Sequence, residues 1–264
     1  MEQRYLFTLL AFLGNMANMF GRDSLRIGVL AIRQEYETCV AANSTECGAV
    51  LWDDGSVAQV LSGFNYGMLL TLLIGGPLAD ILGGKVIMLG ATLVSSTCTA
   101  LIPLLATTSL LALVTSQVVY GMSGGLVVPA LASMLARWEP LGERGRLATV
   151  IYSGSQASAA LTAVFTGLLC HEKSHHWRLV FLLLGLLPLL WLLPWGLLVT
   201  DSPRSHPRIS QREKKLLHCN TATSEARPLL KDIPLKAILS SGTVFTEQCL
   251  QCTVCTVNFV CSVH

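Results

Sequence analysis

The sequence YLFTLLAFLGNMANMFGRDSLRIGVLAI, residues 5–32, is an apolar run long enough to cross a lipid bilayer as one helix. Such a helix needs about 20 mostly apolar residues, because lipid offers no partner to an unpaired backbone amide. No small-residue cleavage site follows the run, so we interpret it as a first span and not as a signal peptide. Five further runs meet the same length, at 57–79, 85–107, 110–135, 149–170 and 178–200. The predicted fold class is therefore an all-α membrane protein with six transmembrane helices.

The composition agrees with a membrane environment. The 264 residues are 52% hydrophobic and 13% charged, whereas a soluble domain usually has about 25% charged residues. The net charge is only +2, and this balance argues against a nucleic-acid partner.

The distribution of Lys and Arg predicts the orientation, since these residues concentrate in cytoplasmic loops. With the N-terminus inside, the outer segments contain only Arg33, Lys173 and Arg178. The inner segments then contain Arg4, Lys85, Arg137, Arg144, Arg146 and eight further cations between 204 and 236. We therefore expect the N-terminus and the basic segment 201–236 to be cytoplasmic.

The predicted outer loop, residues 33–56, is acidic and contains the glycosylation sequon that begins at Asn43. An N-glycan requires a lumenal or extracellular loop, which agrees with this orientation. Cys39 and Cys47 lie in the same loop and form either a disulfide in an oxidising compartment or two free thiols.

The first span carries a polar stripe. At about 100° per residue, Asn15, Asn18, Arg22 and Arg26 fall within an arc of about 80°, and Asp23 lies at its edge. A cation at membrane depth is costly unless it faces protein or a watery cavity. One interpretation is an anion site, because a guanidinium binds carboxylate or phosphate through two parallel hydrogen bonds. The other is that Arg22 pairs with Asp23 or a neighbouring span while Arg26 extends toward the interface.

Polar and small residues in other spans have two interpretations as well. Asn65 and Tyr66 interrupt the second span and either shape a cavity or pack helices together. Gly121 and Gly125 in the fourth span form G-x-x-x-G, which predicts close helix contact.

Four segments carry a resemblance to a known family. GGPLADILGGK (residues 75–85) resembles the loop between spans two and three of major-facilitator transporters. WEPLGERGRL (138–147), SGSQ (153–156) and DSPRSHPRISQRE (201–213) are similar to segments of the family of sialin, the vesicular glutamate transporters and the sodium–phosphate cotransporters. The spacing from AFLG (11–14) to Arg22 also matches that family.

The resemblance implies the N-terminal half of a major-facilitator fold and secondary transport of small organic anions or phosphate. It further implies that Arg22 contacts the substrate and that Asp80, Lys85 and Arg144 belong to the inner gate. The partners would be an anion, a coupling proton or sodium ion and the bilayer, with no cofactor. The membrane would be lysosomal, vesicular or the plasma membrane.

Several positions depart from the family pattern. In the fourth span the family commonly has an Arg and two Glu where this chain has Gln117, Tyr120 and Gly124. The second-span histidine of the glutamate transporters corresponds to Leu61. The resemblance therefore implies neither proton coupling through the fourth span nor glutamate as the substrate.

We expect the resemblance to stop at Ser240. The predicted organisation is a six-helix bundle (1–200), a basic central segment with a short amphipathic helix (201–236) and an incomplete seventh span or Cys-rich tail (237–264). Such a chain, truncated before its second half, is not expected to alternate access alone. A non-transporting or regulatory half-transporter is the competing hypothesis.

Two motifs suggest metal chemistry but lack its other requirements. HEKSH (171–175) spells the zinc-protease signature, yet it lies in a predicted tight turn without an obvious third ligand. Cys249, Cys252 and Cys255 have metal-ligand spacing, with Cys261 and His264 as the nearest further ligands. We predict no metal site and no enzymatic activity.

Overall fold

The computed structural model describes residues 3–41, 54–140, 142–170 and 177–201, which fold into six helices. These are α1 (Gln3–Ala41), α2 (Asp54–Leu82), α3 (Gly84–Thr108), α4 (Leu110–Trp138), α5 (Arg144–Cys170) and α6 (Trp177–Leu198). The shortest, α6, has 22 residues, so each exceeds the length of about 20 that a span needs. The chain divides into two units, Met1–Thr221 and Ala222–His264, and all six helices belong to the first. The predicted all-α fold with six long helices is confirmed.

The helices differ in how apolar they are. Within the described ranges, α3, α4 and α6 are apolar enough to be membrane spans by composition, and α2 joins them if its two segments count as one span. α1 and α5 are long enough but more polar, because α1 carries Arg22, Asp23 and Arg26 and α5 is rich in Ser. The charged residues of α1 therefore have to face protein rather than lipid.

α1 is longer than predicted. It continues as a helix to Ala41, so the prediction of an outer loop from residue 33 was wrong at its start. The extension, RQEYETCVA, is rich in good helix formers such as Arg, Gln, Glu and Ala. The apolar pattern shows where the part of α1 that suits a membrane ends. Residues with high helix propensity continue the helix beyond that point.

α2 is bent. Its segments Gly55–Leu72 and Ile74–Leu82 make an angle of 62°, and Pro77 lies inside the helix. A proline ring collides with the carbonyl four residues earlier, here that of Leu73, and removes one helical hydrogen bond. The bend therefore falls at Leu73, the residue whose carbonyl loses its helical hydrogen bond to Pro77.

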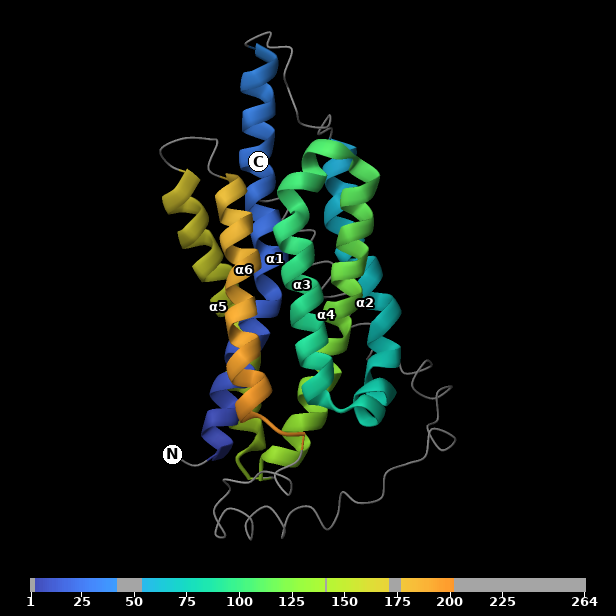
Figure 1. Cartoon of the computed structure of the whole chain (residues 1–264), viewed down its shortest axis with the longest axis vertical. Coiled ribbons are helices and arrows are strands. Elements are labelled where there is room, and N and C mark those ends of the chain that lie inside the picture. Colours follow the sequence, from blue (N-terminus) through green and yellow to red (C-terminus); the bar gives the residue numbers. More distant parts are fainter. Residues whose placement is uncertain (1–2, 42–53, 141, 171–176, 202–264) are drawn as a thin grey trace. The chain divides into compact units, whose positions relative to one another are not determined.

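Most of the helices pack on partners that do not follow them directly in the chain. α2 packs on α4 and α1 on α5, while α3 contacts both α4 and α6 (Figure 1). α6 also lies against α1. Of these pairs only α3 and α4 are consecutive, so a short connection does not by itself predict which helices become partners.

Aromatic residues fill the core at the end of the bundle where α1 begins, which we call the basic end because Arg4, Lys85, Arg137 and Arg144 lie there. The Phe7 and Trp138 rings stack at 5.2 Å, and those of Trp191 and Trp195 at 4.8 Å. The Trp191 indole N–H donates to the Leu10 carbonyl at 2.9 Å. The buried indole N–H group thus has a hydrogen-bond partner, as every polar group inside a membrane requires.

The outer surface is apolar, as lipid contact requires. α6 exposes a set of leucines with exposed fractions from 40% to 82%: Leu179, Leu182, Leu183, Leu186, Leu187, Leu190, Leu193 and Leu197. In water such a surface would be unstable, but in a bilayer it matches the surrounding acyl chains.

Glycines bring α2 and α4 into backbone contact. A Cβ on Gly67 would lie 2.7 Å from the Met122 nitrogen, and one on Gly121 would lie 2.8 Å from the Phe64 carbonyl carbon. A Cβ on Gly125 would lie 2.7 Å from the Met68 oxygen. The close helix contact predicted from Gly121 and Gly125 is therefore confirmed, and α2 is the partner. Small residues matter here because helices in lipid associate by packing, without a hydrophobic driving force.

The Gly67→Val substitution is expected to destabilise the bundle, because the new side chain collides with the α4 backbone, which cannot move aside. Overpacking typically costs about 1–3 kcal/mol. The measurement is unfolding of the purified chain in mixed micelles of mild detergent and increasing SDS. Gly76→Val in the same helix is the control, since nothing lies within 4 Å of a Cβ at Gly76. Equal stability of the two variants would contradict the proposed backbone contact.

Candidate functional site

Arg22 lies near the middle of α1 with its guanidinium between a ring and a carboxylate. Its side chain is 24% exposed, and its Nε lies 3.5 Å from Asp23 Oδ1. Its Cζ lies 5.6 Å from the Phe64 ring centroid. Nε is buried and has no hydrogen-bond partner among the described residues. The side chain therefore has an unsatisfied buried donor at Nε and is open to solvent over 24% of its surface.

Tyr120 of α4 connects to α1 immediately before Arg22. Its hydroxyl accepts a hydrogen bond from the Arg22 backbone N–H at 3.0 Å and donates to the Asn18 carbonyl at 2.5 Å. In an uninterrupted α-helix these two backbone groups bond to each other. The hydroxyl therefore inserts into the helical ladder of α1 and fixes the turn that carries Arg22. Tyr120 entered the sequence analysis only as a departure from the family, and a lone tyrosine in an apolar span gave no signal of this contact.

The two asparagines of the polar stripe point to different helices. Asn15 donates to the Ile151 carbonyl of α5 at 3.1 Å. Asn18 donates to the Thr92 hydroxyl of α3 at 2.8 Å and accepts from Ser95 at 3.3 Å. Both residues are buried. The structure thus places them in helix–helix contacts on either side of α1.

Asp23 faces α5. It is 4% exposed, and its Oδ2 accepts a hydrogen bond from the Ser158 hydroxyl at 2.8 Å. Its Oδ1 is the atom that faces Arg22. The two carboxylate oxygens thus have different neighbours, a hydroxyl on one and a loose ion pair on the other.

The other residues predicted to bind substrate lie around this position with different exposures. Arg26, one turn beyond Arg22, and Asn65, next to Phe64, are partly buried. Tyr66 is 62% exposed. It follows Phe64 by two residues, about 200° around the helix, so it lies on nearly the opposite face of α2. The structure therefore does not bring Tyr66 to the face that meets Arg22.

The departures from the family pattern in α4 are buried near the same site. Gln117 is 1% exposed, and its Nε2 has no hydrogen-bond partner among the described residues. Its Cβ lies 3.2 Å from where a Cβ on Gly63 would be. Gly124 faces the Phe64 ring, which a Cβ would approach to 3.2 Å. The interior next to Arg22 is thus lined by α4 with a neutral amide, a phenol and a glycine.

At the basic end, the residues predicted for the gate join neighbouring helices. Asp80 of α2 pairs with Arg137 of α4 at 3.4 Å. Lys85 donates through Nζ to the Gly196 carbonyl of α6 at 2.7 Å. Arg144 donates to the Ala136 carbonyl at 2.8 Å. The three residues thus stand in separate contacts rather than in one cluster.

The turn between α2 and α3 is built on Gly83, whose φ is +84°. A Cβ there would lie 2.8 Å from the Asp201 carboxylate, which accepts a hydrogen bond from the Lys85 backbone N–H at 2.8 Å. The carboxylate therefore caps the positive end of α3, and glycine provides both the left-handed backbone and the space.

Glu139 follows the last residue of α4 and is buried at the basic end, with 2% exposure. Its Oε1 accepts a hydrogen bond from Thr8 of α1 at 2.9 Å, while Oε2 is buried without a partner among the described residues. Burial raises the pKa of Glu139 to about 7, although the Thr8 hydroxyl and the Arg4 charge oppose this shift. Nearby, Arg4 pairs with Glu143 at 2.9 Å. The family motif in this segment gives no indication of the contact between Glu139 and Thr8.

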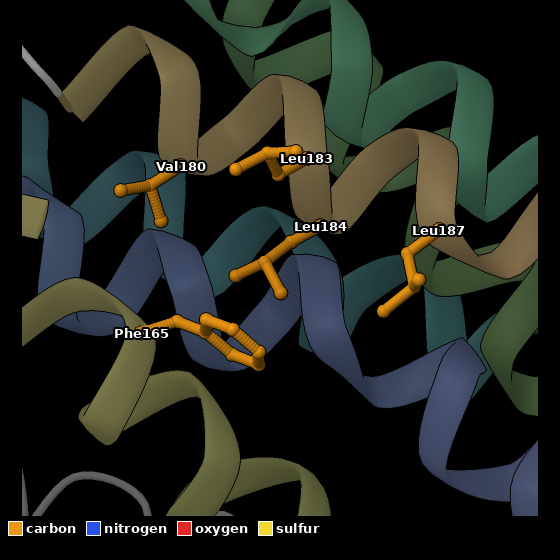
Figure 2. Close-up of a pocket in the computed structure, with 5 residues that line it drawn as sticks. All are labelled: Phe165, Val180, Leu183, Leu184 and Leu187. Carbon is orange, nitrogen blue, oxygen red and sulfur yellow. The ribbon is translucent and has the colours of Figure 1, made fainter.

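An apolar hollow of about 110 Å³ lies between α5 and α6. Figure 2 shows Phe165 of α5 directed toward Val180, Leu183, Leu184 and Leu187 of α6. All five side chains are hydrocarbon, so the hollow has nothing with which to bind an anion. Its chemistry suits an acyl chain.

The comparisons with known proteins agree with this architecture. The sequence profile described as Major Facilitator Superfamily matches residues 11–263. The chain belongs to the Major Facilitator Superfamily. Because the match runs to residue 263, our prediction that the resemblance stops at Ser240 was wrong.

Two relatives identify the branch of the superfamily. Human sialin is 30% identical over 195 residues, covering 71% of this chain and 39% of sialin. The sodium-dependent phosphate transport protein 1 of Arabidopsis thaliana chloroplasts is 29% identical over 243 residues, covering 92% of this chain and 44% of that protein. The resemblance to the sialin and phosphate transporter family is therefore confirmed. The chain spans less than half the length of these relatives.

A solved structure shows the same superfamily fold. A crystal structure of a double-tryptophan mutant of XylE superposes with a TM-score of 0.58 at 18% identity. The superposition covers 84% of this chain and 51% of XylE. The six described helices thus correspond in extent to one half of a major-facilitator fold.

Several predictions concern residues outside the described ranges. These are Asn43, Cys47, the HEKSH motif at 171–175, the amphipathic helix expected within 201–236 and the Cys-rich segment from Cys249 to His264. Cys39 belongs to α1, but its side chain is not described. Among the described residues, no group of His, Cys, Asp and Glu is arranged to hold a metal ion.

The pKa of Glu139 predicts a pH dependence of stability. Because folding raises this pKa from 4.5 to about 7, the folded protein binds a proton that the unfolded chain releases. The contribution of Glu139 to stability is therefore fully present below about pH 4.5 and declines as the pH rises toward 7. We expect the melting temperature of the wild type, relative to Glu139→Gln, to fall between pH 5 and pH 7.5.

Thermal unfolding of both proteins in detergent over this pH range tests the expectation. Subtracting the two melting temperatures removes the contribution of groups that titrate alike in both proteins, and Asp80→Asn is a control for loss of a carboxylate at the same end. A difference that is constant with pH would show that Glu139 does not change its protonation on folding.

Proposed function

We propose that the chain forms the anion-binding half of a secondary transporter for small organic anions or phosphate, with Arg22 as the residue that contacts the anion. The observation that carries the proposal is the Arg22 side chain, which is 24% exposed and whose buried Nε has no hydrogen-bond partner among the described residues. The names of the relatives support the substrate class, since one of them is a phosphate transport protein.

The surroundings of Arg22 suit a reversible anion site. The Phe64 ring supports the guanidinium from one side through a cation–π contact. Tyr120 fixes the backbone of the same turn, so little conformational freedom is lost on binding. Arg26 adds a second positive charge one turn away, and Asn65 follows Phe64 about 100° around α2 and is partly buried. Asn15 and Asn18 position α1 between α5 and α3, while Tyr66 lies on a different face of α2 from Phe64.

The contacts of the basic end support a gating role for Asp80, Lys85 and Arg144. Each joins neighbouring helices or a helix and its connection, and each must change if the helices separate. The ion pair of Asp80 is partly exposed, and such pairs contribute little to stability, which suits a contact that opens and closes. With the N-terminus inside, this gate would face the cytoplasm.

Neutralising Arg22 tests the anion site. We expect Arg22→Gln to weaken anion binding at least tenfold, since a hydrogen bond to a charged group is worth about 1.5–3 kcal/mol. Arg22→Lys should retain part of the affinity, because it keeps the charge but loses the two-pronged geometry. The measurement is titration calorimetry of the purified chain in lipid nanodiscs with phosphate, gluconate and ascorbate.

Arg146→Gln is the matched control, because Arg146 is exposed at the start of α5 and its loss removes the same charge far from Arg22. Equal weakening by both substitutions would indicate a nonspecific charge effect. Unchanged affinity in Arg22→Gln would overturn the assignment of the site.

A further inference from the structure

Asp23 is unusual among the acidic residues of the described helices. The others, Glu35, Glu37, Asp54 and Asp80, lie near helix ends, whereas Asp23 lies in the interior of α1 and is 4% exposed. An isolated buried carboxylate is too costly to persist, and here the compensation is incomplete. Ser158 donates one hydrogen bond to Oδ2, and Arg22 approaches Oδ1 only to 3.5 Å.

The α5 face beside Asp23 continues as a line of buried hydroxyls. Thr162 and Thr166 follow Ser158 at intervals of one turn, are 0% and 5% exposed, and have no hydrogen-bond partner among the described residues. Other helical threonines of this chain bond to the carbonyl one turn earlier, as Thr92 does to Met88 and Thr99 to Ser95. Buried polar atoms without protein partners are the places where internal water binds.

The register of α1 and α5 places these hydroxyls on the side of Asp23 away from the basic end. Asn15 contacts Ile151, and Asp23 contacts Ser158, so the two helices run in parallel. Thr162 therefore lies about one turn beyond Asp23 and Thr166 about two turns beyond it. Together with Ser158 they outline a polar line between the opposite end of the bundle and the carboxylate.

We propose that Asp23 is a proton-binding site linked to the anion site at Arg22, and that Ser158, Thr162 and Thr166 line the route by which the proton reaches it. In the free protein, the Asp23 carboxylate offsets the charge of Arg22. When an anion binds Arg22, that offset is lost, and a proton from water adds to Oδ1. Arg22, its bound anion and the neutral carboxylic acid then have a net charge of zero, as the Arg22–Asp23 pair had before binding. This inference rests on the proposed anion-binding function.

The surroundings favour a proton over a sodium ion. The ionisable groups near Asp23 are Arg22 and Arg26 on α1 and the Tyr120 hydroxyl on α4. The described parts of α3, α5 and α6 contain no acidic residue. A sodium ion would need several oxygen ligands beside a guanidinium that repels it, whereas a proton needs a single carboxylate oxygen. The position also differs from the fourth span, where Gln117 and Tyr120 carry no carboxylate.

Titration calorimetry with gluconate tests the linkage, since gluconate is ionised throughout the range from about pH 5.5 to 7.5. Measurements on the full chain in nanodiscs, in buffers of different ionisation enthalpy, give the number of protons taken up per anion bound. We expect about one proton for the wild type and about none for Asp23→Asn, with gluconate still bound. Glu143→Gln should leave the proton count unchanged.

Ser158→Ala provides an independent reading if Asp23→Asn fails to fold. Because Ser158 contacts one oxygen of the proposed proton-binding group, its loss should change the number of protons taken up per gluconate bound. Thr162→Val should keep the proton count but slow the uptake observed by stopped flow with a pH dye.

The outcomes separate the two proposals. If neither gluconate nor phosphate binds the wild type, both the proposed function and this inference fail. Binding without proton uptake, or proton uptake that persists in Asp23→Asn, overturns this inference alone. Binding that requires sodium in place of choline, with no proton taken up, assigns the cation site to sodium instead.

Discussion

The structure depends on keeping the charges of Arg22 and Asp23 away from lipid in the middle of a membrane helix. A charge at the bilayer centre costs about 3 kcal/mol or more unless protein or water surrounds it. α1 therefore needs neighbours on several sides, and it contacts α5, α6 and α3. The polar residues that accompany the charges, Asn15, Asn18 and Ser158, each bond to a neighbouring helix. The polar stripe thus both requires the bundle and helps to hold it together.

The helix contacts follow from the absence of a hydrophobic driving force in lipid. Where two helices carry no polar residues to join them, as in much of α2 and α4, glycines allow the backbones to touch. Where the helices reach water at the basic end, indole N–H groups, Lys85 and Asp201 form the contacts instead. The contact between α2 and α4 thus relies on backbone packing, whereas the basic end, which reaches water, is joined by hydrogen bonds.

The sequence analysis predicted the number of helices, the close contact at Gly121 and Gly125, and the family, and it placed Arg22 at the candidate site. It could not assign partners. Asn15 and Asn18 share one arc of a helical wheel, yet they bond to α5 and α3, because a buried helix has neighbours on more than one side. Tyr66 was grouped with Asn65 by adjacency, although successive helical residues point about 100° apart. The predicted end of α1 came too early. The apolar residues stop at the membrane interface, whereas residues with high helix propensity continue the helix beyond it.

By itself the sequence determined that the chain is a bundle of membrane helices, since every backbone amide in lipid must be paired within its own helix and this requires long apolar runs. It also determined that the first helix carries ionised groups that lipid excludes. Only the tertiary structure decided which atoms meet them: Ser158 on Oδ2 of Asp23, the Phe64 ring at Arg22, and the Tyr120 hydroxyl within the α1 ladder. These contacts join residues separated in sequence by 42 to 135 positions, and their geometry depends on how whole helices cross, which no local pattern encodes.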